Sequence, residues 1–170
     1  MKFTTPNIVV TNPIPEETRI YYSKSKELVT IVLSILALVF GIYCLTLGID
    51  YLAGALLCFV VGGAFLYFKL KNFTNESPQI ILNEKGLQTV NNPFYYWEYI
   101  TEAGVTKLEM GRSTYYHFTY KTKLDSNEIS LRIDNLNISR KNLSLLIRFY
   151  IEKNKRPSFT YLDLKDLKDT

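Results

Sequence analysis

A long apolar stretch between Leu28 and Leu70 restricts the folds open to this chain more than any other feature. Only Asp50 and Lys69 are charged within it. Because about 20 helical residues cross the hydrocarbon core of a bilayer, the stretch is about twice as long as one span. Gly48 and Asp50 suit a tight turn, and a carboxylate is tolerated far better near the interface than at the membrane centre. The sequence therefore predicts a transmembrane hairpin rather than one helix.

The residues that flank this hairpin predict its orientation. Lys24 and Lys26 precede the first span, and Lys69 and Lys71 end the second, whereas the turn between the spans contains no Lys or Arg. By the positive-inside rule, both termini are then cytoplasmic. We expect a cytoplasmic N-terminal segment at 1–27, spans at 28–48 and 52–70, and a short external turn at 49–51.

Small residues recur at helical spacing in both predicted spans, and such residues let helices approach closely in lipid. They include Gly41, Cys44, Gly54, Cys58 and Gly62. We predict that they pack the two helices of the hairpin against each other, with oligomer formation or a membrane partner as the alternative use. A transporter or proton relay usually needs an ionisable group at mid-membrane, and the hairpin has none there. The pattern favours a membrane anchor.

The chain after Asn72 changes to short segments separated by turns. Residues 115–122 and 129–134 alternate apolar and polar side chains, which predicts an antiparallel sheet with one solvated face. Gly86 is expected to supply the conformation of the first turn. Short strands of this kind favour a small barrel or sandwich. The expected strands are 79–83, 87–90, 95–100, 104–110, 113–123 and 127–134.

A helix is predicted after these strands, from a cap at Ser139 to about Asn154, and Pro157 ends it. Six strands followed by an amphipathic helix is the layout of a pleckstrin-homology (PH)-like barrel, and residues 19–23 could supply its seventh strand. We therefore expect an α+β membrane protein with a PH-like cytoplasmic domain at 72–156. For the tail at 157–170, disorder and one further amphipathic turn in DLKDLKD both stay open.

Four segments in this order are similar to an uncharacterised bacterial family of small inner-membrane proteins. They are IYYSKSKEL before the hairpin, PQIILNEKGL, YYWEYI and LNISRKNLSLLIRFY, and the resemblance covers roughly residues 19–155. Members of that family have two transmembrane helices and a PH-like cytoplasmic domain. The resemblance implies a multi-pass protein of the bacterial inner membrane, and it implies no activity.

Composition and the reactive residues argue against several function classes. The 16 acidic residues are interspersed with the 20 basic ones at a net charge of +4, without the basic stripe of a nucleic-acid surface. Cys44 and Cys58 have no neighbouring His or carboxylate, so they are expected to pack rather than bind metal. His117 is the single histidine, and no catalytic triad or glycine-rich phosphate loop is present. We expect no enzymatic activity, no cofactor and no metal.

Exposed aromatic and basic residues supply the candidate binding sites. The candidates for a protein partner are Tyr95, Trp97, Tyr115 and His117, with core packing as the alternative role. The candidates for an anionic lipid headgroup are the pairs Lys121 with Lys123 and Arg140 with Lys141, with ordinary surface solubility as the alternative.

The leading functional hypothesis is a non-enzymatic, membrane-anchored binding protein that presents its PH-like domain to a protein partner at the cytoplasmic face. An immunity protein against a membrane-acting toxin and a lipid-sensing envelope regulator are the alternatives. Alanine at Tyr95 or Tyr115 should abolish partner binding, whereas leucine at Gly41 or Gly62 should abolish toxin protection. A lipid sensor should respond to Lys121→Glu combined with Lys123→Glu.

Overall fold

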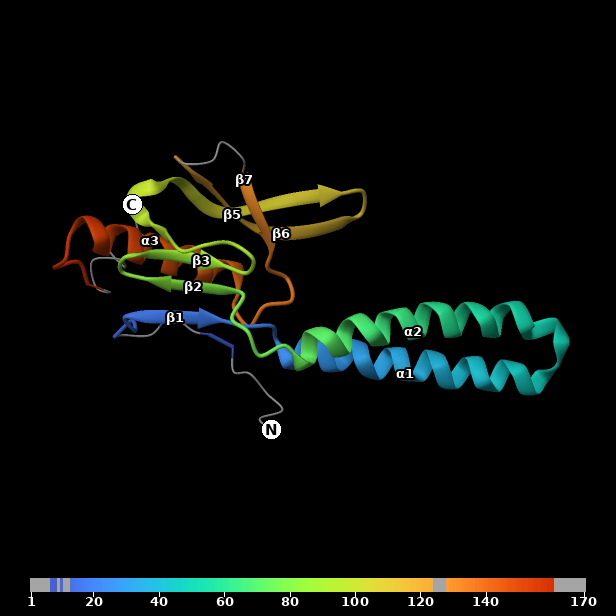
Figure 1. Cartoon of the computed structure of the whole chain (residues 1–170). Coiled ribbons are helices and arrows are strands. Elements are labelled where there is room, and N and C mark those ends of the chain that lie inside the picture. Colours follow the sequence, from blue (N-terminus) through green and yellow to red (C-terminus); the bar gives the residue numbers. More distant parts are fainter. Residues whose placement is uncertain (1–6, 9, 11–12, 124–127, 161–170) are drawn as a thin grey trace. The chain divides into compact units, whose positions relative to one another are not determined.

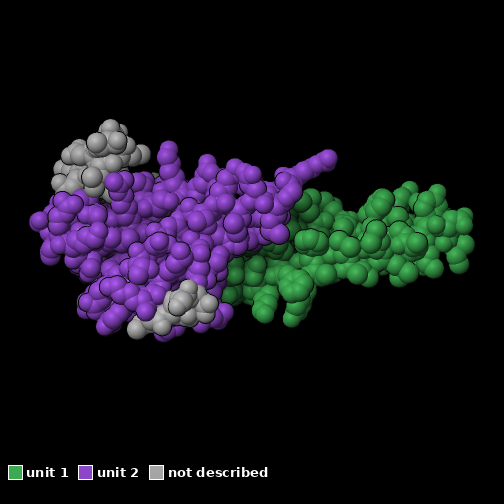
Figure 2. Space-filling model, turned by 90° about the horizontal axis from the view of Figure 1, so that it is seen from above, with its two compact units in different colours: residues 1–5, 22–76 green, residues 6–21, 77–170 purple. Residues whose placement is uncertain are grey.

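The computed structural model describes residues 7, 8, 10, 13–123 and 128–160, and the chain forms two compact units, coloured separately in Figure 2. The helical unit comprises residues 22–76. The β-rich unit takes its described residues from both sides of the helical unit, before Tyr22 and after Glu76. The predicted amphipathic turn in DLKDLKD lies outside the described residues.

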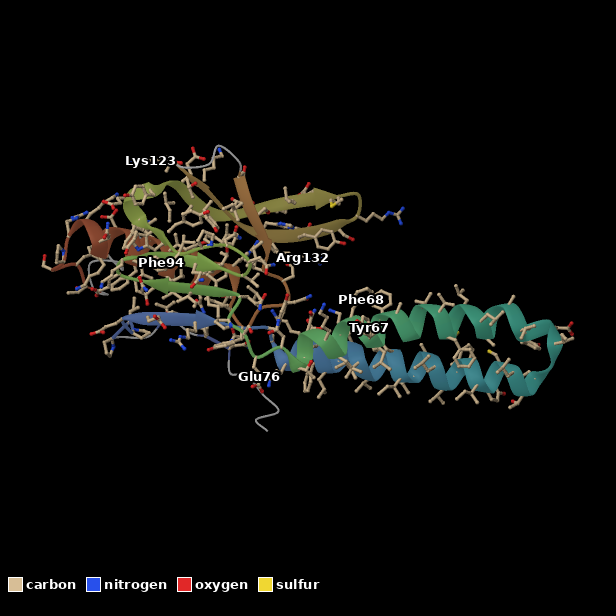
Figure 3. All side chains as sticks on the ribbon, viewed as in Figure 1. Tyr67, Phe68, Glu76, Phe94, Lys123 and Arg132 are labelled. Atoms are coloured by element: carbon tan, nitrogen blue, oxygen red, sulfur yellow. The ribbon has the colours of Figure 1, made fainter. Side chains whose placement is uncertain are left out.

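The helical unit consists of two helices joined by a tight turn. Helix α1 covers Lys24–Leu47, a 3-10 turn covers Ile49–Tyr51, and helix α2 covers Leu52–Thr74. Gly48 adopts φ 121°, a backbone conformation that favours glycine. Both helices are long and apolar enough to cross a membrane, and most of their apolar side chains point outward (Figure 3). The helices extend beyond the predicted spans, to Lys24 at one end and Thr74 at the other.

The described residues of the β-rich unit form two antiparallel sheets and one α-helix (Figure 1). The first sheet has the order β1-β2-β3-β4 and the second has the order β5-β6-β7. The elements are β1 Glu17–Ile20, β2 Ile80–Asn83, β3 Gly86–Thr89, β4 Tyr95–Tyr96, β5 Ile100–Met110, β6 Ser113–Thr122, β7 Glu128–Arg132 and α3 Arg140–Lys155.

The two sheets are not joined into a closed barrel within the described residues, so the barrel prediction is corrected. The segment YYWEYI was expected to be one strand, but it contains three elements. Strand β4 ends at Tyr96, a 3-10 turn covers Trp97–Tyr99, and β5 begins at Ile100 with an irregular register up to Glu102. The turn carries the chain out of the first sheet, and the hydrogen-bonded ladder stops there.

A strand before the helical unit completes the first sheet. Strand β1 pairs antiparallel with β2, and Ile20 lies opposite Ile80. This strand begins two residues earlier than the predicted segment 19–23. Further contacts hold the N-terminal segment, because Ile8 forms a parallel bridge with Ile138 and its carbonyl accepts a hydrogen bond from the Asn142 side chain at 2.9 Å.

The core of the β-rich unit lies between the sheets and α3. Phe118 and Tyr120 of β6 are buried as their alternation predicted, and the Tyr120 hydroxyl lies 2.8 Å from the Thr89 hydroxyl of β3. Helix α3 buries one apolar face. The Ser139 side chain caps this helix by accepting a hydrogen bond from the Asn142 backbone N–H at 3.2 Å. The buried residues of this face are Leu143, Leu146, Ile147, Phe149 and Tyr150.

Tyr150 is expected to make this core less stable as the pH becomes alkaline. Its buried hydroxyl donates to the Pro15 carbonyl at 2.7 Å and accepts from the Thr18 hydroxyl at 2.8 Å. Burial raises the pKa of Tyr150 above its ordinary value of 10.0. The unfolded chain therefore loses this proton at a lower pH than the folded chain. The contribution of the Tyr150 hydroxyl to the free energy of unfolding is complete below pH 10 and falls as the pH rises above it.

We expect Tyr150→Phe to lower the free energy of unfolding by about 1–2 kcal/mol at pH 7, through its lost hydrogen bonds. The same variant should show a shallower loss of stability between pH 9 and about pH 11, because the group that titrates is gone. Thermal melts of the full chain across this range measure both effects. Tyr96→Phe, at a half-exposed position, is the matched control and should follow the wild type. An unchanged alkaline slope in Tyr150→Phe would contradict this assignment.

Candidate functional site

Two of the predicted partner-binding aromatics lie in the packing of the β-rich unit. Trp97 is buried, and its indole N–H donates to the Asn83 carbonyl at 2.9 Å. The ring of Tyr95 meets the ring of Tyr120 edge to face, with 6.0 Å between centroids. These contacts fill the core, as the alternative interpretation of the aromatic cluster had it, and Trp97 is not available to a partner.

The other two candidates, Tyr115 and His117, share the outward face of the second sheet. Leu108 of β5 lies directly opposite Tyr115, and Arg132 of β7 lies opposite His117. Strand β7 pairs with β6 only as far as His117, so the β5–β6 hairpin continues beyond it (Figure 1). Leu108 and Met110 are consequently 44% and 70% exposed. We call this surface the hairpin patch, made of Leu108, Met110, Tyr115, His117 and Arg132.

Local contacts fix the polar members of the hairpin patch. The Arg132 guanidinium, labelled in Figure 3, lies 4.0 Å from the Tyr115 ring centroid, and its Nε donates to Asp134 at 2.8 Å. His117 Nδ1 lies 2.9 Å from the Ser130 hydroxyl. Tyr, Met and Arg are enriched in protein interfaces, where ordered side chains lose little entropy on binding. The arrangement is therefore suited to contact with a protein.

The four predicted headgroup residues do not form one site. Lys121 lies on the outward face of β6 and donates to Glu102 at 2.8 Å, a hydrogen bond that raises the pKa of Lys121. Lys123 follows β6 (Figure 3), whereas Arg140 and Lys141 belong to the first turn of α3. Lys121 faces away from the side of β6 on which the buried Phe118 and Tyr120 lie. The basic residues of β6 are therefore separate from Arg140 and Lys141.

Arg140 and Lys141 instead line a groove between the β5–β6 hairpin and α3, with a volume of about 520 Å³. The Arg140 guanidinium lies 4.6 Å from the ring centroid of Tyr116 and donates to its hydroxyl. We call this feature the basic groove. Its lining residues are Val105, Lys107, Tyr116, Arg140, Lys141, Ser144, Leu145 and Arg148. Lys107 and Arg148 were not singled out in the sequence, where only the neighbouring pair Arg140 and Lys141 gave a signal.

The small residues of the helical unit differ in their surroundings. A Cβ on Gly41 would lie 3.1 Å from the Cys58 Cβ, and one on Gly62 would lie 3.2 Å from a Leu38 methyl group. Cys44 is buried. Gly54 lies in open space instead, with no atom within 4 Å of an added Cβ, so the packing of the two helices does not use it.

The helical unit also holds an ion pair that sequence reasoning missed. Glu27 of α1 is fully buried, and its Oε2 lies 3.0 Å from Nζ of Lys69 in α2. Neither carboxylate oxygen has a hydrogen-bond donor in good geometry among the described residues, so the Lys69 charge is its main compensation. The positions are far apart in sequence and each resembles an ordinary flanking charge, which is why no pattern indicated their pairing.

No metal centre accompanies these features: within the described part of the chain, no three His, Cys, Asp or Glu residues are grouped so that they could hold an ion. Comparison of the chain with protein-family models, with curated proteins and with solved structures returned no match. The assignment of a function accordingly depends on the hairpin patch, the basic groove and the two helices.

Proposed function

We propose that this chain is a membrane-anchored binding protein, without enzymatic activity of its own, that holds a protein partner through the hairpin patch. In this proposal α1 and α2 cross the bacterial inner membrane as a hairpin. The β-rich unit, a PH-like domain with open sheets, then lies at the cytoplasmic face together with both termini.

The extension of the β5–β6 hairpin beyond β7 is the observation that carries the proposal. A hairpin with no partner to bind would be expected to end in polar residues, because exposed apolar side chains gain nothing from water. Here Leu108 and Met110 are exposed beside Tyr115, and Arg132 is already ordered against that ring. An apolar and aromatic centre with an ordered Arg is the composition typical of an interface hot spot.

The anchor is supported by the surface of the helical unit. Only 17% of the most apolar window of α1 and 11% of that of α2 is buried, although both windows are strongly apolar. Such helices need an apolar environment that the chain does not itself provide. Lysines lie at the start of α1 and at the end of α2, and none lies in the turn between the helices, which favours cytoplasmic termini.

Site-specific photo-crosslinking in native membranes tests the partner. A photoreactive residue replaces Met110 in the full-length chain, and a matched chain carries it at Tyr96, which is also exposed. We expect a protein adduct of discrete mass from position 110 and none of that mass from position 96. Adding Leu108→Ala and Tyr115→Ala should reduce this adduct about tenfold, since hot-spot truncations cost more than 1 kcal/mol each.

Two outcomes would count against the hairpin patch. One is an adduct that persists undiminished when Leu108 and Tyr115 are alanine, and the other is crosslinking to lipid alone. If the cell instead loses protection from a membrane-acting toxin on Gly41→Leu while the patch variants keep it, the immunity-protein alternative gains the support.

A further inference from the structure

We propose that the basic groove is a binding site for the phosphate group of a compact phosphate ester. This site lies on the side of the β5–β6 hairpin opposite the hairpin patch, and the inference does not depend on the protein partner proposed above. The shared ligand chemistry is a phosphate with at least two negative charges, carried either by a free small molecule or by a lipid headgroup.

The charges that line the basic groove are all positive. Lys107 comes from β5, and Arg140, Lys141 and Arg148 come from α3. Among the residues that the structure describes, no carboxylate lines the groove. The spacing of 140, 141 and 148 brings these three residues to one side of α3, next to the face buried in the core. Arg140, Lys141 and Arg148 repel one another, and a multivalent anion would relieve this repulsion.

The described carboxylates that neighbour the lining residues are already paired with cations. Glu152, one helical turn after Arg148, pairs with Lys155 at 3.4 Å and with Arg156 at 2.8 Å. Glu109 pairs with Lys107 on β5, and Asp134 pairs with Arg132 at 2.8 Å while accepting the Tyr116 backbone N–H at 3.3 Å. Lys141 and Arg148, by contrast, are exposed and form no ion pair with any carboxylate among the described residues. These two side chains are the ones free to close on an anion.

Arg140 is oriented for anion recognition by Tyr116. Its guanidinium lies 4.6 Å from the ring centroid and donates one N–H to the hydroxyl, and these two contacts order the side chain. Arginine binds phosphate through paired N–H groups, and an ordered guanidinium loses less entropy on binding. The positive end of the α3 dipole, at the turn that contains Arg140 and Lys141, adds to the attraction.

The shape of the groove fits a small organic phosphate rather than a bare ion. A volume of about 520 Å³ lies within the range of small-molecule sites. Val105 and Leu145 supply apolar lining beside the cations, and Ser144 adds a hydroxyl. The phosphate would meet the charged residues, and the remainder of the ester would contact Val105 and Leu145.

Calorimetric titration of the full-length chain in a neutral detergent, at 0.15 M salt, tests this site. The probes are phenyl phosphate, which is a compact ester, a short-chain phosphatidic acid and, as a control without net charge, a short-chain phosphatidylcholine. The variant Lys141→Glu with Arg148→Glu reverses two groove charges. The control variant Lys85→Glu with Arg112→Glu makes the same change in net charge at exposed positions outside the groove.

We expect saturable binding of a phosphate probe that weakens by about tenfold or more in the groove variant and by less than about twofold in the control, because screening at this salt makes distant charges ineffective. Binding of phenyl phosphate, with or without phosphatidic acid, would identify a free phosphate ester as the source, and binding of phosphatidic acid alone would identify a lipid headgroup. Equal weakening in both variants, or no saturable binding of either phosphate probe, would overturn the proposal. A thermal melt of each variant confirms that the fold is retained.

Discussion

Replacing Gly86 by alanine is expected to lower the free energy of unfolding of the β-rich unit by about 3 kcal/mol, the upper part of the range for overpacked cores. Gly86 is buried at the start of β3, where it pairs with Tyr96 of β4. An added Cβ would lie 2.0 Å from the Tyr95 carbonyl oxygen and 2.9 Å from the Phe94 ring. The nearest atom belongs to the backbone of β4, so relief requires a shift of the strand rather than of a side chain.

Gly104→Ala is the matched control for this prediction. Gly104 also lies in a strand, β5, but an added Cβ there has no atom within 4 Å. Its substitution should change the free energy of unfolding by no more than about 0.5 kcal/mol. Chemical denaturation followed by the fluorescence of Trp97, which lies next to β4, measures both variants. Equal stabilities for the two variants would show that β4 can shift to accommodate the added Cβ, and this prediction would then be wrong.

The second large effect is expected on replacing Lys69 by leucine. This substitution leaves the fully buried Glu27 carboxylate without its nearby positive charge. Removing one partner of a buried ion pair typically costs about 3–5 kcal/mol, because the remaining charge stays desolvated. We therefore expect α1 and α2 to separate at a much lower temperature. The double variant Glu27→Leu with Lys69→Leu should recover most of the loss, since two apolar side chains replace the pair.

Access to the buried Cys44 thiol reports the separation of the two helices. The full chain, carrying Cys58→Ser so that one thiol remains, is heated in detergent while alkylation of Cys44 is followed. Lys71→Leu is the control, because Lys71 is exposed on the same helix and the variant makes the same change in charge. If Lys71→Leu exposes Cys44 at the same temperature as Lys69→Leu, the effect comes from net charge and not from the pairing with Glu27.

The helical unit and α3 were predictable because their signals are periodic and local. The apolar run fixed both helices, and Gly48 with Asp50 located the turn between them. For α3, the Ser139 cap indicated where the helix begins. The recurrence of apolar residues indicated the face that is buried in the structure. Such features depend on residues within a few turns of one another, which a single sequence contains in full.

The role of Gly86 was predicted incorrectly, for a physical reason. Glycine near a turn suggests a positive φ, but the positive-φ glycines of the described residues are Gly48 and Gly111. The turn before β3 is held by the Asn83 side chain, which accepts hydrogen bonds from the backbone N–H groups of Lys85 and Gly86. Gly86 is needed for the approach of β4, a contact that appears only once the strands are paired.

The candidate sites were predicted least well because they join elements across the fold. The basic groove combines Lys107 with Arg140 and Arg148, and the hairpin patch combines Leu108 with Tyr115 and Arg132. Each residue taken singly is an ordinary surface side chain. Only the register of β5 with β6 decides which of them face α3 and which face away, and a shift by one residue would exchange the two sets.

The pairing of β1 with β2 has a consequence for biosynthesis. These strands are neighbours in the first sheet, yet the whole helical unit is translated between them. Strand β1 leaves the ribosome first and must stay available until β2 follows. If the helices enter a bilayer, β1 and β2 meet only when the chain has crossed it an even number of times. A nascent chain whose second helix failed to insert would leave the two strands on opposite sides of the membrane, with Ile20 and Ile80 unpaired, and would display an incomplete sheet to the cell's proteases and chaperones.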